Sequence, residues 1–149
     1  MRFHLVDKII DYTPWKSAIG IKNITVVDEL LEYSSEIEAK VFPKTLLCEC
    51  VLQTCAWLIV KSSNSTKRPV ILKFGNIEYG RNACIGDKVQ LIVEILSYSE
   101  DTVTISGCAK VEDEKILCFD ECLISLLSTD DLECREDTQT IIDCLFRED

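Results

Sequence analysis

The sequence predicts an α+β fold in which a curved antiparallel sheet wraps around one long buried helix. Residues 46–60 carry apolar side chains on almost every side of a helix, so this helix must be enclosed on most sides. The clearly polar residues inside it are Glu49, Gln53 and Thr54. From Pro69 onward apolar and polar residues alternate, which is typical of strands with one buried face.

Length and composition indicate one globular domain with an apolar core. The chain has 149 residues, of which 47% are hydrophobic, and a mean hydropathy of +0.12. Its first residues do not resemble a secretory signal, and its apolar runs fall short of the length that a membrane span requires. We therefore expect a cytoplasmic protein that does not associate with membranes.

The charge is concentrated at the C-terminus. The formal net charge is −10, and residues 127–149 hold eight acidic residues and two arginines. This distribution predicts a domain at residues 1–127 followed by an acidic tail at residues 128–149. Because no basic patch interrupts the acidic composition, we expect no binding to nucleic acid.

The nine cysteines are predicted to be free thiols that act as small core residues. They are scattered singly except for Cys48 and Cys50, and the chain contains one histidine. This spacing fits neither a zinc site nor a disulfide framework, so we expect no metal and no cofactor. A reactive thiolate at Cys48 or Cys50 is disfavoured because no base or positive charge lies beside them in the sequence.

Four segments precede the helix. Residues 2–11 form a short apolar opening, either a strand or one helical turn, and residues 13–15 form a break. Residues 17–27 are rich in Ile, Val and Thr, which predicts a strand with a possible kink at Gly20. Residues 28–40 are charged and lack a clear period, so they predict a loop or a loose helix.

The helix and the segments after it follow in a regular order. Pro43 opens the helix, because a proline in the first turn costs no hydrogen bond. A polar loop at residues 62–68 comes next. Residues 69–79 predict a strand that is broken near Gly75, and residues 85–87 predict a turn. Three further strands are predicted at 89–95, 102–111 and 116–127, with a hairpin turn at 112–114. The tail is expected to be flexible or to fold as a peripheral helix around 138–146.

Three fragments in this order carry a resemblance to a known family. The opening segment is Phe-His-Leu-Val-Asp-Lys-Ile at residues 3–9, and Ile-Gly-Asp at residues 85–87 precedes the long strands. Pro43 is followed by Glu49 after six residues and by Gln53 after four more. The chain resembles, over roughly residues 1–126, the hotdog-fold β-hydroxyacyl-acyl-carrier-protein dehydratases of fatty-acid synthesis.

The resemblance implies both a site and its chemistry. In that family a histidine takes the α-proton of a 3-hydroxyacyl thioester, and a carboxylate, here Glu49, protonates the departing hydroxyl. Backbone N–H groups hold the thioester oxygen, and the substrate-binding positions would be Pro43, Lys44, Thr45 and Gln53. The family's histidine and carboxylate meet across a dimer interface, and the acyl chain arrives on acyl carrier protein or coenzyme A.

The sequence departs from this pattern at the histidine. The family's His-Phe-Pro-Gly stretch places the histidine eight residues before the helix-opening proline, where this chain has Ser35. The glycine that follows is absent too, and Lys44 replaces the glycine after the proline. A serine hydroxyl cannot replace imidazole as a base without a partner. His4 matches a non-catalytic position of the family.

Several functions remain open from the sequence. The first is a degenerate dehydratase that binds acyl thioesters as a homodimer or lends Glu49 to a histidine-bearing paralogue in a heterodimer. The second is a hotdog thioesterase that uses Glu49 and the amides of Lys44 and Thr45. The others are an active dehydratase with another base and a structural subunit whose acidic tail engages a basic partner.

For each candidate residue a structural role is the alternative. Glu49 would then be satisfied by backbone donors or by a partner subunit, and Gln53 would be an interface amide. Trp57 and its apolar neighbours would line either the core or an acyl tunnel.

Overall fold

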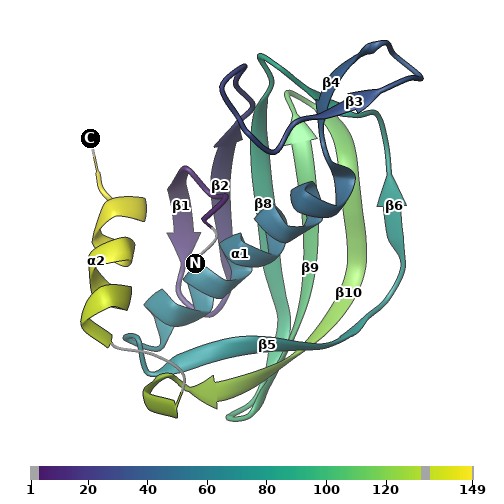
Figure 1. The fold of residues 1–149 in the computed structure, drawn as a ribbon. Helices are drawn as coiled ribbons and strands as arrows, with labels where there is room; N and C mark the ends of the chain where they lie inside the picture. The colour runs from purple at the N-terminus through teal and green to yellow at the C-terminus, as the bar shows by residue number, and fades with distance from the viewer. Residues whose placement is uncertain (1–3, 132–134, 149) are drawn as a thin grey trace.

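A computed structural model describes residues 4–131 and 135–148 and shows a curved antiparallel sheet around a central helix (Figure 1). The main sheet has seven strands. Their order is β1 (Lys8–Thr13), β2 (Ser17–Asn23), β8 (Lys88–Tyr98), β9 (Thr102–Val111), β10 (Glu114–Ser128) and β5 (Lys67–Phe74), with β6 (Ile77–Tyr79) pairing with another part of β10. This arrangement confirms the predicted α+β fold class.

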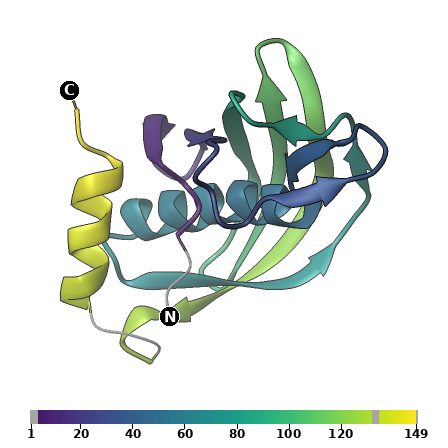
Figure 2. The same ribbon diagram turned by 45° about the horizontal axis from the view of Figure 1, so that its top comes forward.

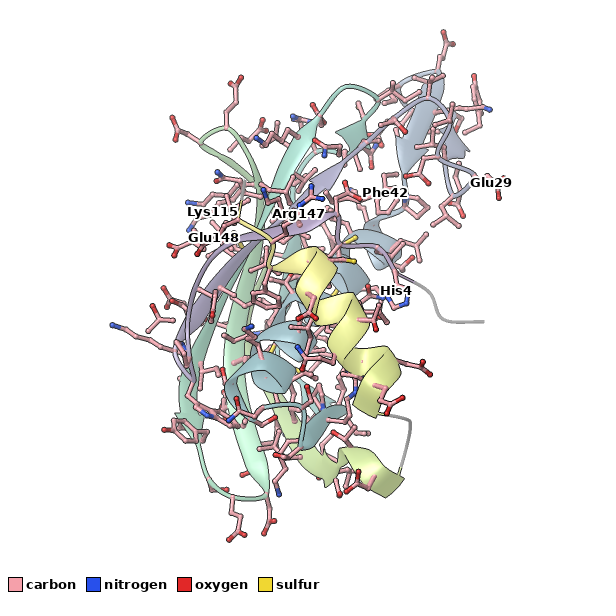
Figure 3. All side chains as sticks on the ribbon, turned by 90° about the vertical axis from the view of Figure 1, so that its left-hand side faces the viewer. His4, Glu29, Phe42, Lys115, Arg147 and Glu148 are labelled. Atoms are coloured by element: carbon pink, nitrogen blue, oxygen red, sulfur yellow. A yellow bond between two sulfur atoms is a disulfide. The ribbon has the colours of Figure 1, made fainter. Side chains whose placement is uncertain are left out.

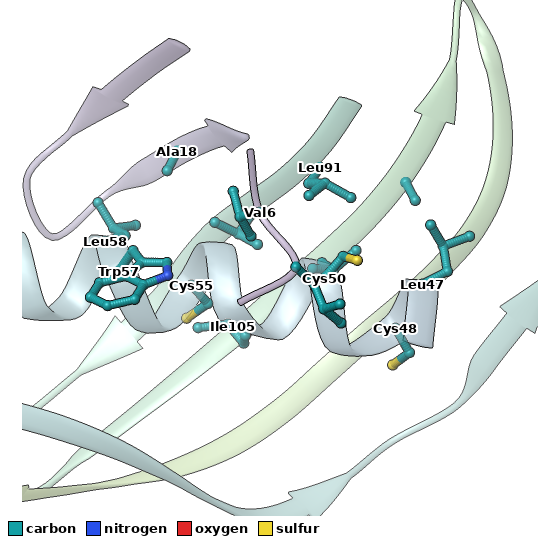
Figure 4. Packing of buried hydrophobic residues seen from close by; sticks show 14 of the residues in the cluster. Val6, Ala18, Leu47, Cys48, Cys50, Cys55, Trp57, Leu58, Leu91 and Ile105 are labelled. Carbon is teal, nitrogen blue, oxygen red and sulfur yellow. The ribbon is translucent and has the colours of Figure 1, made fainter. Parts of the chain in front are cut away.

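The helix α1 (Lys44–Ser62) fills the concave side of the sheet (Figures 1 and 2). Ten of its 19 residues are buried, and Figure 4 shows several of them packed against Val6, Leu91 and Ile105. The expectation that the apolar runs fall short of a membrane span is wrong for α1, which is long and apolar enough to cross one; the core helix of a soluble protein passes the same test. Its burial against five strands, β2, β5, β8, β9 and β10, identifies α1 as a core helix.

Two glycines let strands approach α1 closely. A Cβ atom at Gly107 in β9 would lie 2.4 Å from Phe119 Cζ and 2.6 Å from Val51 Cγ1. A Cβ atom at Gly20 in β2 would lie 2.8 Å from Thr54 Oγ1. Gly20 therefore makes room for the helix, and the irregular pairing lies in β1, between Ile9 and Asp11, rather than at the predicted kink.

The segment that was expected to be a loop or a loose helix forms part of a second sheet. The strands β3 (Glu32–Ser34) and β4 (Ala39–Phe42) make a hairpin, and β4 also pairs with β7 (Ala83–Cys84). These strands are so short that period-two alternation cannot appear in their sequence, and β4 also depends on pairing with β7, about 40 residues further along the chain.

The predicted turn at residues 85–87 is present and is held by side chains. Gly86 has a φ of +96°, which glycine adopts readily. Asp87 accepts hydrogen bonds from Arg81 Nη1 at 2.8 Å and from the N–H of Cys84 at 2.9 Å. Partial burial works in the opposite direction, but these bonds together lower the pKa of Asp87 from its ordinary value.

The C-terminal residues include the helix α2 (Arg135–Leu145), which lies near the C-terminal end of α1 (Figure 2). A short 3₁₀ turn, Thr129–Asp131, leads away from β10. The rings of Phe146 and Tyr12 pack edge to face at 5.0 Å, and Ile142 and Leu145 are buried in the core. A helix was predicted in this region as one of two alternatives. The division into a domain and an acidic tail stays a prediction.

The expectation that all nine cysteines are free thiols is wrong for two of them. Cys108 of β9 and Cys118 of β10 form a disulfide. They are directly opposite in the strand register, which no spacing along the chain reveals. Among the described residues six cysteines are free, and four of these, Cys48, Cys50, Cys55 and Cys122, are buried as expected.

We predict that Gly107→Ala destabilises the protein by about 1–3 kcal/mol, because the added methyl group overpacks the contact between β9 and α1. Urea unfolding at fixed protein concentration measures the loss. Ser106→Ala on the opposite face of the same strand is the matched control. Equal stability of the two variants would contradict the close approach of strand and helix.

Candidate functional site

Glu49 lies in the second turn of α1, on the side of the helix that the sheet leaves partly open. Leu46, Glu49, Gln53 and Ala56 are each half-buried, whereas all the residues between them except Leu52 are buried. Their spacing of three or four residues places them along one face of the helix. This face brings together two of the predicted site residues, Glu49 and Gln53.

A chain of hydrogen bonds fixes the orientation of Glu49. The side-chain nitrogen Nε2 of Gln53 donates to Glu49 Oε1 at 3.0 Å. The backbone N–H of Leu5 donates to Gln53 Oε1 at 2.9 Å. The amide orientation follows from these two partners, since Gln53 must accept on one side and donate on the other. The N-terminal segment therefore positions the carboxylate through Gln53.

The start of α1 supplies a second group of polar atoms near Glu49. Pro43 is the N-cap residue, and its side chain contains no group that could accept a hydrogen bond from the first turn. The N–H groups of Lys44, Thr45 and Leu46 have no partner within the helix. Thr45 and Glu49 are four residues apart, which is about 6 Å along the helix axis. These N–H groups could hold an oxygen that carries partial negative charge.

Ser35 lies apart from these groups. It is exposed in the turn that joins β3 to β4, and this hairpin extends away from the helix (Figures 1 and 2). The spacing from Pro43 predicts that Ser35 takes the place of the family's histidine, but within this subunit no hydrogen bond joins its hydroxyl to Glu49 among the described residues. The site predicted at Pro43, Lys44, Thr45, Glu49 and Gln53 remains a prediction, as does the degenerate role of Ser35.

The chain's single histidine lies toward the other end of the helix. His4 is exposed at the surface (Figure 3), and its ring centre is 6.0 Å from that of Trp57. Trp57 follows Glu49 by eight residues, which is about 12 Å along the helix axis. Figure 4 shows Trp57 well separated along α1 from Cys48, the neighbour of Glu49. Among the described residues of one subunit, no hydrogen bond or ion pair joins His4 to Glu49.

The thiols beside Glu49 are held neutral. Burial, and to a lesser degree the negative charge of Glu49, raises the pKa of Cys48 to about 11. Burial is also the main cause that raises the pKa of Cys50. A thiol of this kind is a poor nucleophile at neutral pH. Among the described residues, no three His, Cys, Asp or Glu side chains form a group that could hold a metal ion.

Sequence reasoning missed the hydrogen bond from Leu5. This residue lies 48 positions before Gln53, and a backbone donor has no side-chain signature. The signal that could have found it is the apolar segment at residues 3–9, which matches the opening segment of the dehydratases and must lie close to the helix to bury Leu5 and Val6.

No family model matches the chain, but individual proteins do. The 3-hydroxyacyl-[acyl-carrier-protein] dehydratase FabZ of Rickettsia bellii is 30% identical over 115 residues, which cover 75% of this chain and 78% of the relative. FabZ of Rickettsia massiliae is 31% identical over 115 residues with the same coverage. FabZ of Vibrio cholerae is 26% identical over 118 residues, which cover 76% of each protein.

Solved structures with similar folds are more distant in sequence. The E. coli PaaI protein from the phenylacetic acid degradation operon has a TM-score of 0.64 at 12% identity, covering 80% of this chain and 78% of that chain. A hypothetical thioesterase protein with coenzyme A from Streptococcus pneumoniae has a TM-score of 0.62 at 11% identity, covering 81% of this chain and 85% of that chain. At these identities the likeness concerns the fold, and it confirms the predicted hotdog fold.

We predict that Gln53→Ala destabilises the protein by about 1–3 kcal/mol, because the buried N–H of Leu5 loses its acceptor and Glu49 loses a donor. Gln90→Ala on the sheet is the matched control. Both free energies of unfolding come from urea titration at one protein concentration. A Gln53→Ala variant as stable as the control would show that the hydrogen-bond chain contributes nothing.

Proposed function

The chain belongs to the FabZ family of 3-hydroxyacyl-[acyl-carrier-protein] dehydratases, and from this we propose that it binds acyl thioesters beside Glu49 but does not dehydrate them alone. The relatives named above act, by their names, on 3-hydroxyacyl groups carried by acyl carrier protein. The matched region spans 75% of this chain, which supports a ligand of the same class here.

We propose that this chain retains two parts of a dehydratase site: the acid, and the N–H groups that hold the thioester oxygen. The carboxyl group of Glu49, oriented by Gln53, is the acid that would protonate a departing 3-hydroxyl group. The N–H groups of Lys44 and Thr45 would hold the thioester oxygen while charge builds on it, and Pro43 sets the direction of this first turn. These groups bind and polarise an acyl thioester without need of a metal or a cofactor.

We propose that the base is the missing part, and the positions of Ser35 and His4 carry this proposal. Dehydration requires removal of an α-proton, and a histidine of the dehydratases does this work. In this proposal Ser35 occupies that position, and it lies on an exposed turn. The ring of His4 packs beside Trp57, and among the described residues no hydrogen bond joins His4 to Glu49. Because one positioned acid or base contributes typically about 10²–10⁴-fold to a rate, a homomer without the base turns over far more slowly.

We also propose that the protein forms a dimer through the exposed edge of its sheet. The end strand β5 exposes Val70, Ile71 and Leu72, with exposed fractions of 41%, 43% and 58%. An end strand with apolar side chains favours pairing with another sheet edge. A homodimer through β5 would cover these residues. A heterodimer with a histidine-bearing relative would also provide the imidazole that this chain lacks, and Glu49 would act in the shared site.

Thioester hydrolysis is the second candidate function. Its support is the half-buried Glu49 carboxylate close to the N–H groups of the first helical turn, an arrangement that needs no histidine. Glu49 would then activate water, or attack the carbonyl carbon itself, and the thiol would leave.

The test uses the purified full-length homomer with 3-hydroxyacyl-coenzyme A thioesters. We predict measurable binding by calorimetry, no enoyl product above the uncatalysed rate, and no release of free thiol. Glu49→Gln is the informative variant, because it keeps the size of the side chain and removes the acid. Glu94→Gln, at an exposed position on β8, is its control.

Each other outcome has a definite meaning. Enoyl product that disappears in Glu49→Gln but persists in Glu94→Gln would overturn the proposed inactivity and establish a dehydratase. Thiol release with the same dependence would establish the thioesterase. Failure to bind any of the thioesters would overturn the proposal that the chain is an acyl-thioester protein.

A further inference from the structure

The disulfide between Cys108 and Cys118 lies on the outer face of the sheet, away from α1. The two residues are direct partners in the register of β9 and β10, with Cα atoms 4.2 Å apart. Their neighbours along the strands, Gly107 and Phe119, are buried against the helix. Because side chains alternate between the faces of a strand, both sulfur atoms face outward, and both cysteines are half-buried.

A hollow of about 300 Å³ lies over this pair. Its walls include Lys110 and Lys115 beside the cysteines, and Glu94 on the neighbouring strand. The two lysines are register partners in the ladder of β9 and β10, and the pair Ala109–Leu117 lies between them and the cysteine pair. Two ammonium groups against one carboxylate favour the thiolate form of the reduced cysteines, and they also favour an anionic ligand.

The buried cysteines differ from the outer pair in their pKa and therefore in their reactivity. Burial raises the pKa of Cys48 to about 11, and that of Cys122 to about 11. Burial raises the pKa of Cys50 and Cys55 even further. Buried thiols of this kind are inert in thiol exchange because the thiolate is the nucleophile. The outer pair combines two adjacent sulfur atoms, access to solvent and nearby positive charge.

We propose that Cys108 and Cys118 form a reversible redox site that exchanges with small anionic disulfides such as glutathione disulfide. One cysteine thiolate attacks a sulfur atom of the small disulfide, which breaks its S–S bond and releases one thiol. The second cysteine then attacks the mixed disulfide, forms the Cys108–Cys118 bond and releases the second thiol. Two protein thiols are oxidised and one small disulfide is reduced to two thiols.

The first test follows the thiols of the native full-length protein. Reduced protein is treated with glutathione disulfide, alkylated with iodoacetamide and mapped by peptide mass spectrometry. We predict that Cys108 and Cys118 become protected together as one linked peptide pair, and that dithiothreitol restores both. Cys108→Ser should stop the reaction halfway, with one glutathione retained on Cys118. The Cys84→Ser variant is the control for a half-buried cysteine elsewhere in the fold.

The second test measures whether Lys110 and Lys115 accelerate the thiol exchange. A rise of one unit in the pKa of the attacking thiol lowers its thiolate fraction about tenfold and raises its nucleophilicity about threefold, so exchange slows about threefold. We predict that exchange slows by this factor in the double variant Lys110→Gln and Lys115→Gln, and that its rate does not change in the double variant Lys16→Gln and Lys73→Gln.

The proposed redox site is overturned if Cys108 and Cys118 stay open to alkylation in the folded protein, or if they link only after unfolding. An equal rate in the two lysine variants overturns the role of the hollow.

Discussion

The structure depends on the enclosure of an apolar helix that carries one carboxylate. An ionised carboxylate in an apolar helix is costly unless donors satisfy it, and here Gln53 donates to Glu49 while the N–H of Leu5 donates to Gln53. The same bonds attach the N-terminal segment to α1. The sheet covers the other sides of the helix, and glycines at positions 20 and 107 allow the strands to approach it. The enclosure of α1 thus both forms the core and orients the carboxyl group of Glu49.

The polar contacts that orient Glu49 are separate from the hairpin that carries Ser35, the residue that we propose at the histidine position. The polar contacts of Glu49 come from α1 and from the N-terminal segment, whereas Ser35 lies on the exposed turn between β3 and β4. That hairpin is stabilised by pairing with β7 and not by a catalytic residue. In our proposal, a serine at position 35 therefore leaves the helix, the sheet and the orientation of the Glu49 carboxyl group intact. The outer face, with Cys108 and Cys118, is chemically independent of this side.

Local patterns predicted much of the fold, and long-range pairing accounts for what they missed. The helix after Pro43 and the long strands β8, β9 and β10 have strong periodicity, so their sequence alone indicates them. The strands β3 and β4 are too short to show a period. The disulfide and the donor at Leu5 depend on strand register and on a contact across 48 residues. For the same reason the sequence could identify Glu49 and Gln53 as neighbours one helical turn apart but could not identify Leu5.

The central claim is that no imidazole reaches the acid of the central helix when the chain assembles with itself. A crystal structure of the homomer with a bound acyl-thioester analogue tests it most directly. The account predicts that Glu49 keeps its bond to Gln53, that the thioester oxygen faces the start of α1, and that every imidazole nitrogen lies beyond hydrogen-bond reach, about 3.2 Å, of the Glu49 carboxylate. An imidazole within that reach, contributed by the partner subunit's His4, would contradict the account.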